Sequence, residues 1–181
     1  MRISPFETGK TALTRFEELT LPHLDAAYNL ARWLVKNEQD AEDIVQEAYM
    51  RAFKFFATFR GDNARTWLLA IVRNTSYTWL KENRSGATTP FDENIHGDVD
   101  GVANQESKLV NDADALLVRQ ALNELPLEFR EVMVLREMEG LSYKEISEMA
   151  NVPLGTVMSR LARARKWLQD RLASRLKKKE A

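Results

Sequence analysis

The chain has 181 residues, of which 44% are hydrophobic and 29% charged, and its formal net charge is −1. These are globular values, and the length allows one domain or two small ones. The sequence has no cysteine and two histidines, His23 and His96, which excludes disulfides, thiolate catalysis and cysteine-ligated zinc. We expect no catalytic residues, no metal and no other cofactor. The N-terminus lacks the apolar core of a signal peptide, and no apolar run approaches the ~20 residues of a membrane span, so the sequence predicts a cytoplasmic protein with no direct membrane insertion.

The small net charge conceals an uneven distribution. Residues 85–114 carry seven acids and one base, whereas residues 160–179 carry nine bases and one acid. The stretch 85–110 mixes Gly, Pro, Ser, Asn and Asp with scattered apolar residues that follow no period, which predicts a linker, either a plain flexible tether or a segment with a more specific role. We therefore predict an all-α protein with two small helical domains, residues 1–84 and 111–181, joined by a flexible acidic linker at 85–110.

Two amphipathic helices are expected in the first half of the chain. Thr20 and Pro22 are typical of a helix start, and apolar residues then recur at helical spacing to about residue 36. Asp40 is the expected N-cap of the next helix, in whose first turn the helix dipole favours acids. Capping and solvation explain those acids. They do not explain why a polar ridge continues beyond the first turn. The apolar side of this helix is expected to include Ile44, Val45, Ala48, Phe53, Phe55, Phe56 and Phe59.

A hinge and a third helix follow. Residues 60–65, RGDNAR, predict a break, because Gly and Asn supply the permissive backbone of a tight reversal, and helix is expected again by Thr66. This helix interleaves aromatic and basic side chains, a pattern that suits unstacked bases with cations on phosphates. Burial in a core is the other explanation of its aromatic residues. The mixed donors and rings are Arg65, Arg73, Asn74, Tyr77, Trp79, Lys81 and Arg84.

The second half of the chain predicts a helix-turn-helix. Pro126 ends one helix and starts another, with Gly140 as its expected C-cap. Ser142 and Glu145 form a capping box that starts a short helix. A turn at 151–153 then leads into a long basic helix, and this short helix, turn and basic helix are the pattern of a motif that reads the major groove. Its apolar face is predicted at Leu154, Val157, Leu161, Ala164 and Leu168, and its polar face at Thr156, Ser159, Arg160, Arg163 and Lys166.

Four motifs occur in one order in this chain: DAEDIVQEAYMRAF, FRGDNARTWLLAIVRN, LPLEFREVMVLREMEGLSYKEIS and VPLGTVMSRLARAR. Together they resemble the sigma factors of bacterial RNA polymerase, and most closely the extracytoplasmic-function (ECF) group, which keeps only regions 2 and 4. The resemblance covers residues 16–172. It implies a promoter-recognition subunit that binds core polymerase through the β′ clamp helices and the β flap. It also implies promoter DNA and an anti-sigma factor as further partners.

The resemblance also implies roles for individual residues. The polar ridge is similar to the surface that docks on the β′ clamp helices, and residues 59–66 are similar to the loop that pockets a base flipped from the −10 element. Asn74 matches an asparagine that reads a −10 base. The residues implied in polymerase binding are Asp40, Asp43, Gln46, Glu47 and Arg51. Those implied in −10 binding are Phe59, Arg60, Asn63, Arg65, Trp67, Arg73, Asn74, Tyr77 and Trp79.

In the second domain the resemblance implies contacts with the −35 element. Met158 departs from the family, because other members can carry Arg there and a thioether cannot bond to guanine as a guanidinium does. By the same resemblance the acidic linker follows the path through the active-site cleft toward the RNA exit channel. The implied −35 residues are Tyr143, Lys144, Thr156, Met158, Ser159, Arg160, Arg163 and Lys166.

A different class of protein shares part of this pattern. The second domain alone is also typical of an autonomous helix-turn-helix regulator whose first domain senses a signal or dimerises. Residues 40–84 argue against that alternative, because a sensor domain does not need the hinge and the aromatic-basic helix. An enzyme has little support, since the sequence shows neither a glycine-rich phosphate loop nor a recognisably spaced nucleophile and histidine.

Overall fold

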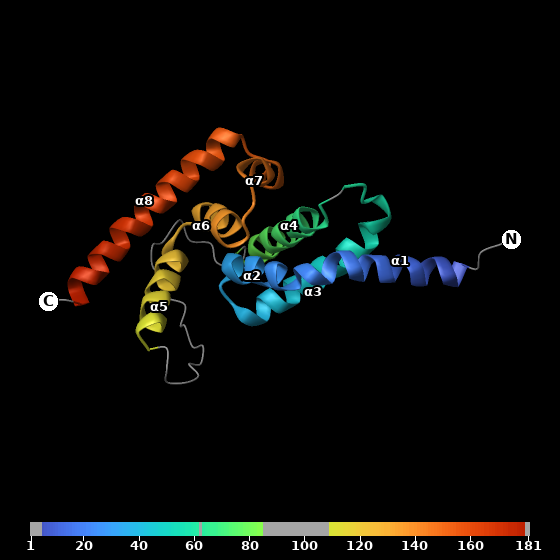
Figure 1. Cartoon of the computed structure of the whole chain (residues 1–181), viewed down its shortest axis with the longest axis horizontal. Helices are drawn as coiled ribbons and strands as arrows, with labels where there is room; N and C mark the ends of the chain where they lie inside the picture. Colours follow the sequence, from blue (N-terminus) through green and yellow to red (C-terminus); the bar gives the residue numbers. More distant parts are fainter. Residues whose placement is uncertain (1–4, 62, 85–108, 180–181) are drawn as a thin grey trace.

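The computed structural model describes residues 5–61, 63–84 and 109–179, and all the regular elements in these ranges are helical. They form a first bundle, within residues 5–84, and a second bundle, within residues 109–179. The two bundles are arranged along the long axis of the molecule, with α1 and α8 extending toward opposite ends (Figure 1). The expected all-α fold with two small helical domains is confirmed.

The first bundle consists of α1 (Pro5–Thr20), α2 (Leu24–Val35), α3 (Glu38–Phe55) and α4 (Ala64–Arg84). Short 3-10 turns at Leu21–His23 and Phe56–Thr58 follow α1 and α3. Helices α2, α3 and α4 pack against one another, and burial of their apolar faces is the main source of the bundle's stability. The side chains at the centre of this packing include Leu30, Leu34, Ile44, Leu68, Leu69 and Val72.

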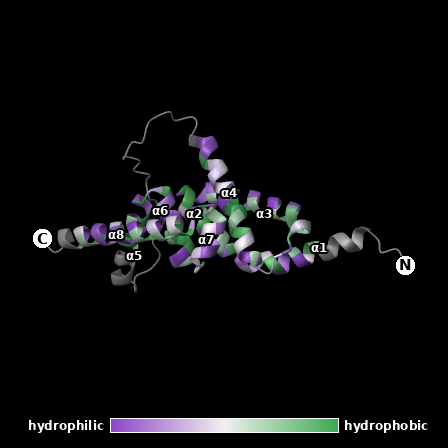
Figure 2. Ribbon diagram, turned by 90° about the horizontal axis from the view of Figure 1, so that it is seen from above, coloured by the Kyte–Doolittle hydropathy of each residue, from purple (hydrophilic) through white to green (hydrophobic). Residues whose placement is uncertain are grey.

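The second bundle consists of α5 (Leu109–Glu124), α6 (Leu127–Met133), α7 (Tyr143–Ala150) and α8 (Leu154–Lys179), and α6 continues as a π-helical turn at Val134–Met138. Helices α7 and α8 form the predicted helix-turn-helix. Helix α8 packs on α5, α6 and α7, while hydrophilic residues recur along its length toward the C-terminus (Figure 2). The fully buried side chains include Leu125, Leu135, Leu141, Ile146 and Leu161.

Local sequence explains several helix boundaries. Gly140 has φ +67°, a left-handed conformation that glycine adopts without strain, so its expected C-cap role fits the backbone. The capping box is confirmed: the Ser142 side chain accepts from the Glu145 backbone N–H, and the Glu145 carboxylate accepts from the Ser142 backbone N–H. Asn151 (φ 52°) then ends α7, because Asn tolerates the left-handed region better than most residues.

The structure corrects three expectations about the first bundle. Asn37, not Asp40, caps α3, and its side chain accepts from the Asp40 N–H at 3.0 Å. Thr20 does not cap the following turn, because its buried hydroxyl donates to the Phe16 carbonyl of α1. Phe53 and Phe55 are 46% and 51% exposed, so they are not core residues, although the Phe53 ring contacts Phe16 of α1 edge-on with 5.2 Å between the ring centres.

Two further boundaries differ from the sequence expectation. Helix α4 begins at Ala64, two residues before Thr66, because Asn63 accepts from the Thr66 N–H at 3.0 Å. Helix α5 begins at Leu109, inside the interval expected as linker. Residues 85–108, which carry the rest of the expected acidic linker, lie outside the described residues. The division into residues 1–84, 85–110 and 111–181 stays a prediction.

The two bundles are packed against each other. Helix α2 contacts α6, and α4 contacts α7, so buried side chains from both bundles form one continuous cluster. The contact brings the aromatic-basic helix α4 next to a series of acids in the second bundle. The position of these acids determines which side chains of the expected −10 surface are exposed and which are paired.

Candidate nucleic-acid and partner interfaces

Helix α4 carries several hydrogen-bond donors on the side that meets the second bundle, and one of them, Arg73, stacks on the ring of Tyr77. Arg73 and Tyr77 are four residues apart, which places them on one face of the helix, and the Arg73 guanidinium lies 4.4 Å from the centre of the Tyr77 ring. Arg65 and Thr66 lie on the first turn of α4, and Asn63 caps it. A cation, a ring face and amide and hydroxyl donors are therefore aligned along one helix.

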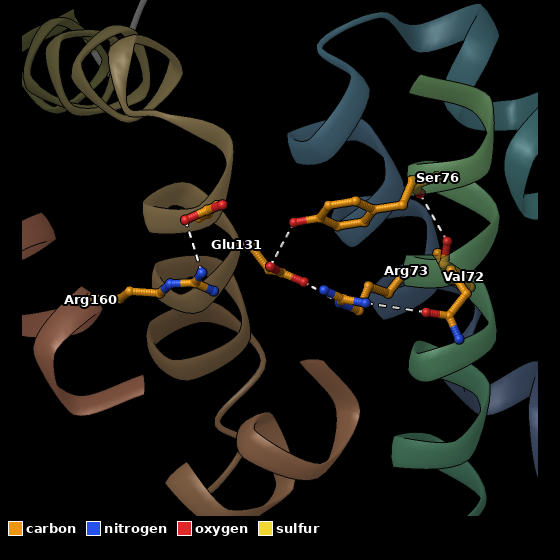
Figure 3. Close-up of polar contacts among 8 residues, drawn as sticks. Val72, Arg73, Ser76, Glu131 and Arg160 are labelled. Carbon is orange, nitrogen blue, oxygen red and sulfur yellow. Dashed lines mark hydrogen bonds and ion pairs between the residues drawn. The ribbon is translucent and has the colours of Figure 1, made fainter. Parts of the chain in front are cut away.

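Glu131 of α6 occupies the centre of this face. Its carboxylate is completely buried, pairs with the Arg73 guanidinium and accepts from the Tyr77 hydroxyl at 2.8 Å. Figure 3 shows Glu131 pointing from α6 toward Arg73 on α4. Burial, followed by the neighbouring Glu131 charge, raises the pKa of Tyr77 well above its usual value, so this hydroxyl stays a donor at neutral pH.

Two more carboxylates of the second bundle bind the start of α4. Glu139 accepts from Arg65 at 2.5 Å. Burial raises the pKa of Glu139, an effect that the Arg65 charge opposes. Glu145 accepts from the Thr66 hydroxyl at 2.9 Å and from the Asn63 side-chain amide at 3.0 Å. Four of the nine residues expected to bind the −10 strand therefore contact acids of the second bundle: Asn63, Arg65, Arg73 and Tyr77.

Three aromatic rings, those of Phe56, Phe59 and Trp67, form a cluster on the two sides of the hinge at residues 60–65. The Phe59 and Trp67 rings lie 4.7 Å apart, and Phe56 is within 6.3 Å of both. Arg60 donates to the Ala57 carbonyl at 3.1 Å. A β-carbon at Gly61 would lie 3.2 Å from the Phe59 ring, so the close approach of backbone and ring favours glycine here. The hinge is thus a shaped apolar surface beside exposed cationic and amide groups.

The remaining residues of the expected −10 surface divide into exposed and packed. Asn74 is exposed, and its side-chain carbonyl accepts from Arg73 at 3.2 Å. Trp79 is half-buried and packs against the core. Packing against the core therefore explains the Trp79 ring, whereas the Asn74 side chain faces solvent and is free of the core.

The polar ridge of α3 lies on the outer side of the first bundle. Asp43, Gln46 and Arg51 are exposed, Asp40 and Glu47 are half-buried, and Glu47 accepts from Arg51 at 2.6 Å. A largely apolar pocket of about 460 Å³ adjoins the ridge between α2 and α3. Polar side chains beside an apolar hollow are typical of a protein-docking surface. The pocket is lined by Leu24, Asp25, Tyr28, Glu42, Val45, Gln46 and Tyr49.

Six of the eight expected −35 residues lie on α8, away from the apolar residues that it buries, and the other two, Tyr143 and Lys144, lie in the first turn of α7. All five residues predicted for the apolar face of α8 are buried except Leu154, which is 47% exposed because it lies in the first turn. Arg163 and Lys166 are exposed, and neither has an ion-pair partner within the described residues. Arg160 differs, because it donates to Glu128 of α6 at 2.9 Å (Figure 3). The others, Tyr143, Lys144, Thr156, Met158 and Ser159, are half-buried or exposed.

Sequence reasoning missed the residues that join the two bundles. Arg130 is 2% exposed and donates to the Trp33 and Leu34 carbonyls of α2, at 2.7 and 3.3 Å, and to carbonyls of its own bundle. The sequence pattern predicts no role for Glu131 and Glu139, and only a capping role for Glu145. The available signal is the adjacent charges of Arg130 and Glu131 directly before the apolar run VMVL, but the sequence does not indicate the partners of these two side chains.

Comparison with known proteins identifies the family. The sigma-70 region 2 family matches residues 19–86, and the sigma-70 region 4 family matches residues 115–168. The RNA polymerase sigma-H factor of Pseudomonas aeruginosa is 33% identical over 165 residues, which cover 87% of this chain and 86% of the relative. The ECF RNA polymerase sigma-E factor of Escherichia coli K12 is 34% identical over 141 residues, or 74% of each chain. This chain belongs to the ECF sigma factor family.

Solved structures of sigma factors share the fold. The sigma factor RpoE from Bartonella quintana, crystallised with the anti-sigma factor NepR, superimposes with a TM-score of 0.69 at 28% identity, covering 88% of this chain and 97% of that one. CnrH, solved with the cytosolic domain of CnrY, has a TM-score of 0.62 at 23% identity and agrees in fold. In this sigma factor the first bundle corresponds to region 2 and the second to region 4.

Two further observations describe the sigma factor. No helix in the ranges that the structure describes combines the length and apolar character needed to cross a membrane. The same ranges contain no group of three or more His, Cys, Asp or Glu side chains suited to hold a metal ion.

Proposed function

We propose that this ECF sigma factor binds core RNA polymerase through the outer face of α3 and directs it to promoters with two DNA-reading surfaces. The observation that carries the proposal is that one chain contains both region 2 and region 4. In each region, a helix that carries one of the family's motifs exposes polar side chains. The proposed polymerase contacts are Asp40, Asp43, Gln46, Glu47 and Arg51, next to the apolar pocket between α2 and α3. Partner side chains from the β′ clamp helices would fill that pocket.

Recognition of the −10 element is assigned to the hinge and α4. A base that flips out of the duplex loses stacking energy. It regains part of that energy by stacking on the aromatic rings beside the hinge, which is worth about 1–3 kcal/mol per base. Asn74 is exposed and carries both a donor and an acceptor, so it suits the Watson–Crick edge of a base. Arg65 and Arg73 supply positive charge for the phosphates of the melted strand.

Recognition of the −35 element is assigned to α8. Its N-terminal turn enters the major groove, where Thr156, Met158 and Ser159 face base edges, and Arg163 and Lys166 reach phosphates farther along. Glu128 holds Arg160 at the side of the helix. Contacts with the groove edge would compete for that guanidinium.

Regulation by an anti-sigma factor is part of the proposal. Its support is the similar sigma factor RpoE, which is described in complex with the anti-sigma factor NepR. We also propose that the protein acts in the cytoplasm, where core polymerase is found, and that it has no catalytic activity of its own.

Run-off transcription tests this function. The full chain is added to core polymerase on a library of promoters, and the start sites are mapped, with core polymerase alone as the control. We expect initiation at a subset of promoters that share −10 and −35 sequences. Specific binding to duplex DNA without polymerase, combined with no promoter-specific initiation, would instead support an autonomous helix-turn-helix regulator.

A further inference from the structure

We propose that region 4 of this sigma factor is an intramolecular competitor of the melted −10 strand. In this arrangement Glu131, Glu139 and Glu145 occupy the donors of region 2 that the DNA needs. The inference rests on the proposed function of α4. It goes beyond that function because the occluding groups belong to the same chain and act without a partner protein.

The chemistry of the contacts is that of a phosphate substitute. A carboxylate accepts from a guanidinium in the same geometry as a phosphate, through charge-assisted hydrogen bonds. Arg73 and Arg65 each pair with a region 4 carboxylate, Glu131 and Glu139. The Tyr77 hydroxyl donates to Glu131 at 2.8 Å. The groups proposed to bind the strand backbone are therefore already satisfied by anions.

The contacts are spread along most of α4 rather than gathered at one point. They run from Asn63 to Tyr77, which at 1.5 Å per residue is about 21 Å of helix. Glu131 is completely buried between the bundles, so a DNA strand cannot reach Arg73 and Tyr77 while region 4 is docked. Binding of the strand and docking of region 4 are thus mutually exclusive at these two residues.

Arg130 strengthens the docking from the neighbouring position on α6. Its guanidinium donates to the Trp33 and Leu34 carbonyls at the C-terminal end of α2, where the helix dipole favours a cation. Adjacent residues of α6 thus place a cation against α2 and an anion against α4. This opposite pairing fixes the orientation of region 4 on region 2.

Asn74 is the exception on this face of region 2, because it is exposed beside the occluded Arg73. The docked state therefore leaves the proposed base-reading side chain accessible while the backbone-binding groups are covered. The apparent affinity for single-stranded DNA equals the affinity of the undocked state multiplied by the fraction of molecules in which region 4 is undocked.

The first test measures DNA binding by the free full chain. The probe is a fluorescent pool of single-stranded 12-mers of random sequence, followed by anisotropy. The variant Glu131→Gln/Glu139→Gln keeps the shape of both side chains but removes the two charges that hold Arg73 and Arg65. The control Glu17→Gln/Glu18→Gln removes two charges from exposed positions on α1. We expect about tenfold tighter binding for the first variant, as the undocked fraction rises, and less than about twofold for the control.

The second test measures the separation of the bundles. Because the chain contains no cysteine, Glu82→Cys and Gln169→Cys, both exposed, accept a donor and acceptor dye pair without background labelling. We expect energy transfer to fall when the random 12-mers are added to the otherwise unchanged chain, and to be low already in Glu131→Gln/Glu139→Gln.

These outcomes decide the proposal independently of transcription. Equal gains in affinity for the variant and its control, or unchanged energy transfer at saturating DNA, would overturn it. If the double variant fails to fold, as judged by circular dichroism, the DNA titration of the unchanged labelled chain decides alone. Absence of promoter-specific transcription with core polymerase would overturn the proposed function, whereas the docking measurement uses no polymerase.

Discussion

The carboxylate of Glu131 and the amide of Asn74 show how differently neighbouring functional side chains are placed. A fully buried anion is stable only when its charge is paired and its lone pairs are bonded, and Glu131 meets both conditions through Arg73 and Tyr77. Asn74 adjoins Arg73 in the sequence but faces solvent, with one hydrogen bond to that arginine. One side chain thus holds the molecule together, while the other is accessible to a ligand.

Asn74→Ala is expected to relax −10 selectivity with little loss of polymerase binding. Removing an amide that bonds a base edge costs about 1–3 kcal/mol of discrimination, whereas α3 and its pocket are untouched. The measurement is initiation by the holoenzyme on promoters randomised at −10, together with a core-binding titration. Thr78→Ala, one turn farther along α4, is the control. Loss of core binding by Asn74→Ala would show that this part of α4 belongs to the polymerase interface.

Met158→Arg is expected to shift the preferred −35 bases toward guanine at one position. The Met158 side chain is 52% exposed on α8, so a longer side chain fits without repacking, and a bidentate Arg–guanine contact is worth about 1–3 kcal/mol. Start-site sequencing from a −35-randomised library measures the shift. Met158→Leu, which keeps an apolar group, should retain the original preference. Identical base distributions for the Arg and Leu variants would show that residue 158 does not contact a base of the −35 element.

At the scale of elements, helix α7 has two functions that share one carboxylate. One oxygen of Glu145 accepts from the Ser142 N–H at 2.8 Å and closes the capping box, and the other accepts from Thr66 and Asn63 of region 2. The start of the helix-turn-helix is therefore also a docking point. Loss of this carboxylate would weaken both the cap and the interface.

Glu145→Gln is expected to lower the free energy of unfolding at pH 7 by about 1 kcal/mol, the usual worth of a cap. The hydrogen bonds from Ser142, with smaller contributions from Thr66 and the Arg65 charge, hold the pKa of Glu145 below its usual 4.5. Because the folded pKa is lowered, this stabilisation is present above about pH 4.5 and is lost as the pH falls through the folded pKa.

Urea unfolding at several pH values measures this difference. The gap between the unchanged chain and Glu145→Gln should narrow as the pH falls below 4.5. Glu139, whose pKa is raised by burial, has the opposite dependence but is present in both proteins, so its contribution cancels. A gap that stays constant with pH would contradict a role for the ionised Glu145 carboxylate.

At the scale of the whole molecule, α6 connects three parts of the protein. Its Glu128 holds Arg160 of α8, the helix proposed to read the −35 element, Glu131 holds Arg73 of α4, and Arg130 holds the end of α2. A short helix with successive charged residues on different sides thus links both proposed DNA-reading surfaces. Separation of the bundles would break the two contacts with region 2 and leave the contact with α8 intact.

Arg130→Met is expected to weaken the docking of the bundles and to lower the free energy of unfolding by about 2 kcal/mol, because hydrogen bonds from a charged group to buried carbonyls are lost. Energy transfer between dyes at 82 and 169 should fall. The control is Arg136→Met, since Arg136 donates to the Leu141 carbonyl within region 4. It should lower stability without changing the transfer. Equal transfer in both variants would mean that Arg130 stabilises region 4 alone.

The sequence by itself determined the helical class, the helix-turn-helix, the capping box at Ser142 and the two helices, α4 and α8, that are proposed to read DNA. These features depend on interactions between residues at most four apart, such as helical periodicity and caps, so local pattern encodes them. Asp40 is not the N-cap of α3 because Asn37, three residues earlier, is an equally suitable capping residue and takes that role. The exposure of Phe53 and Phe55 differs from the expectation because helical periodicity alone does not indicate which apolar side chains other elements cover.

Only the tertiary structure decided that region 4 covers the donors of α4. The contacts of Arg73 with Glu131, Arg65 with Glu139 and Asn63 with Glu145 join residues 58, 74 and 82 positions apart. Any acid of the second bundle could have accepted from these donors as far as residue type is concerned. The packing of α2 on α6 and of α4 on α7 selects the three that do, because it sets the distances and, around the buried Glu131, excludes the water that would otherwise screen the charges.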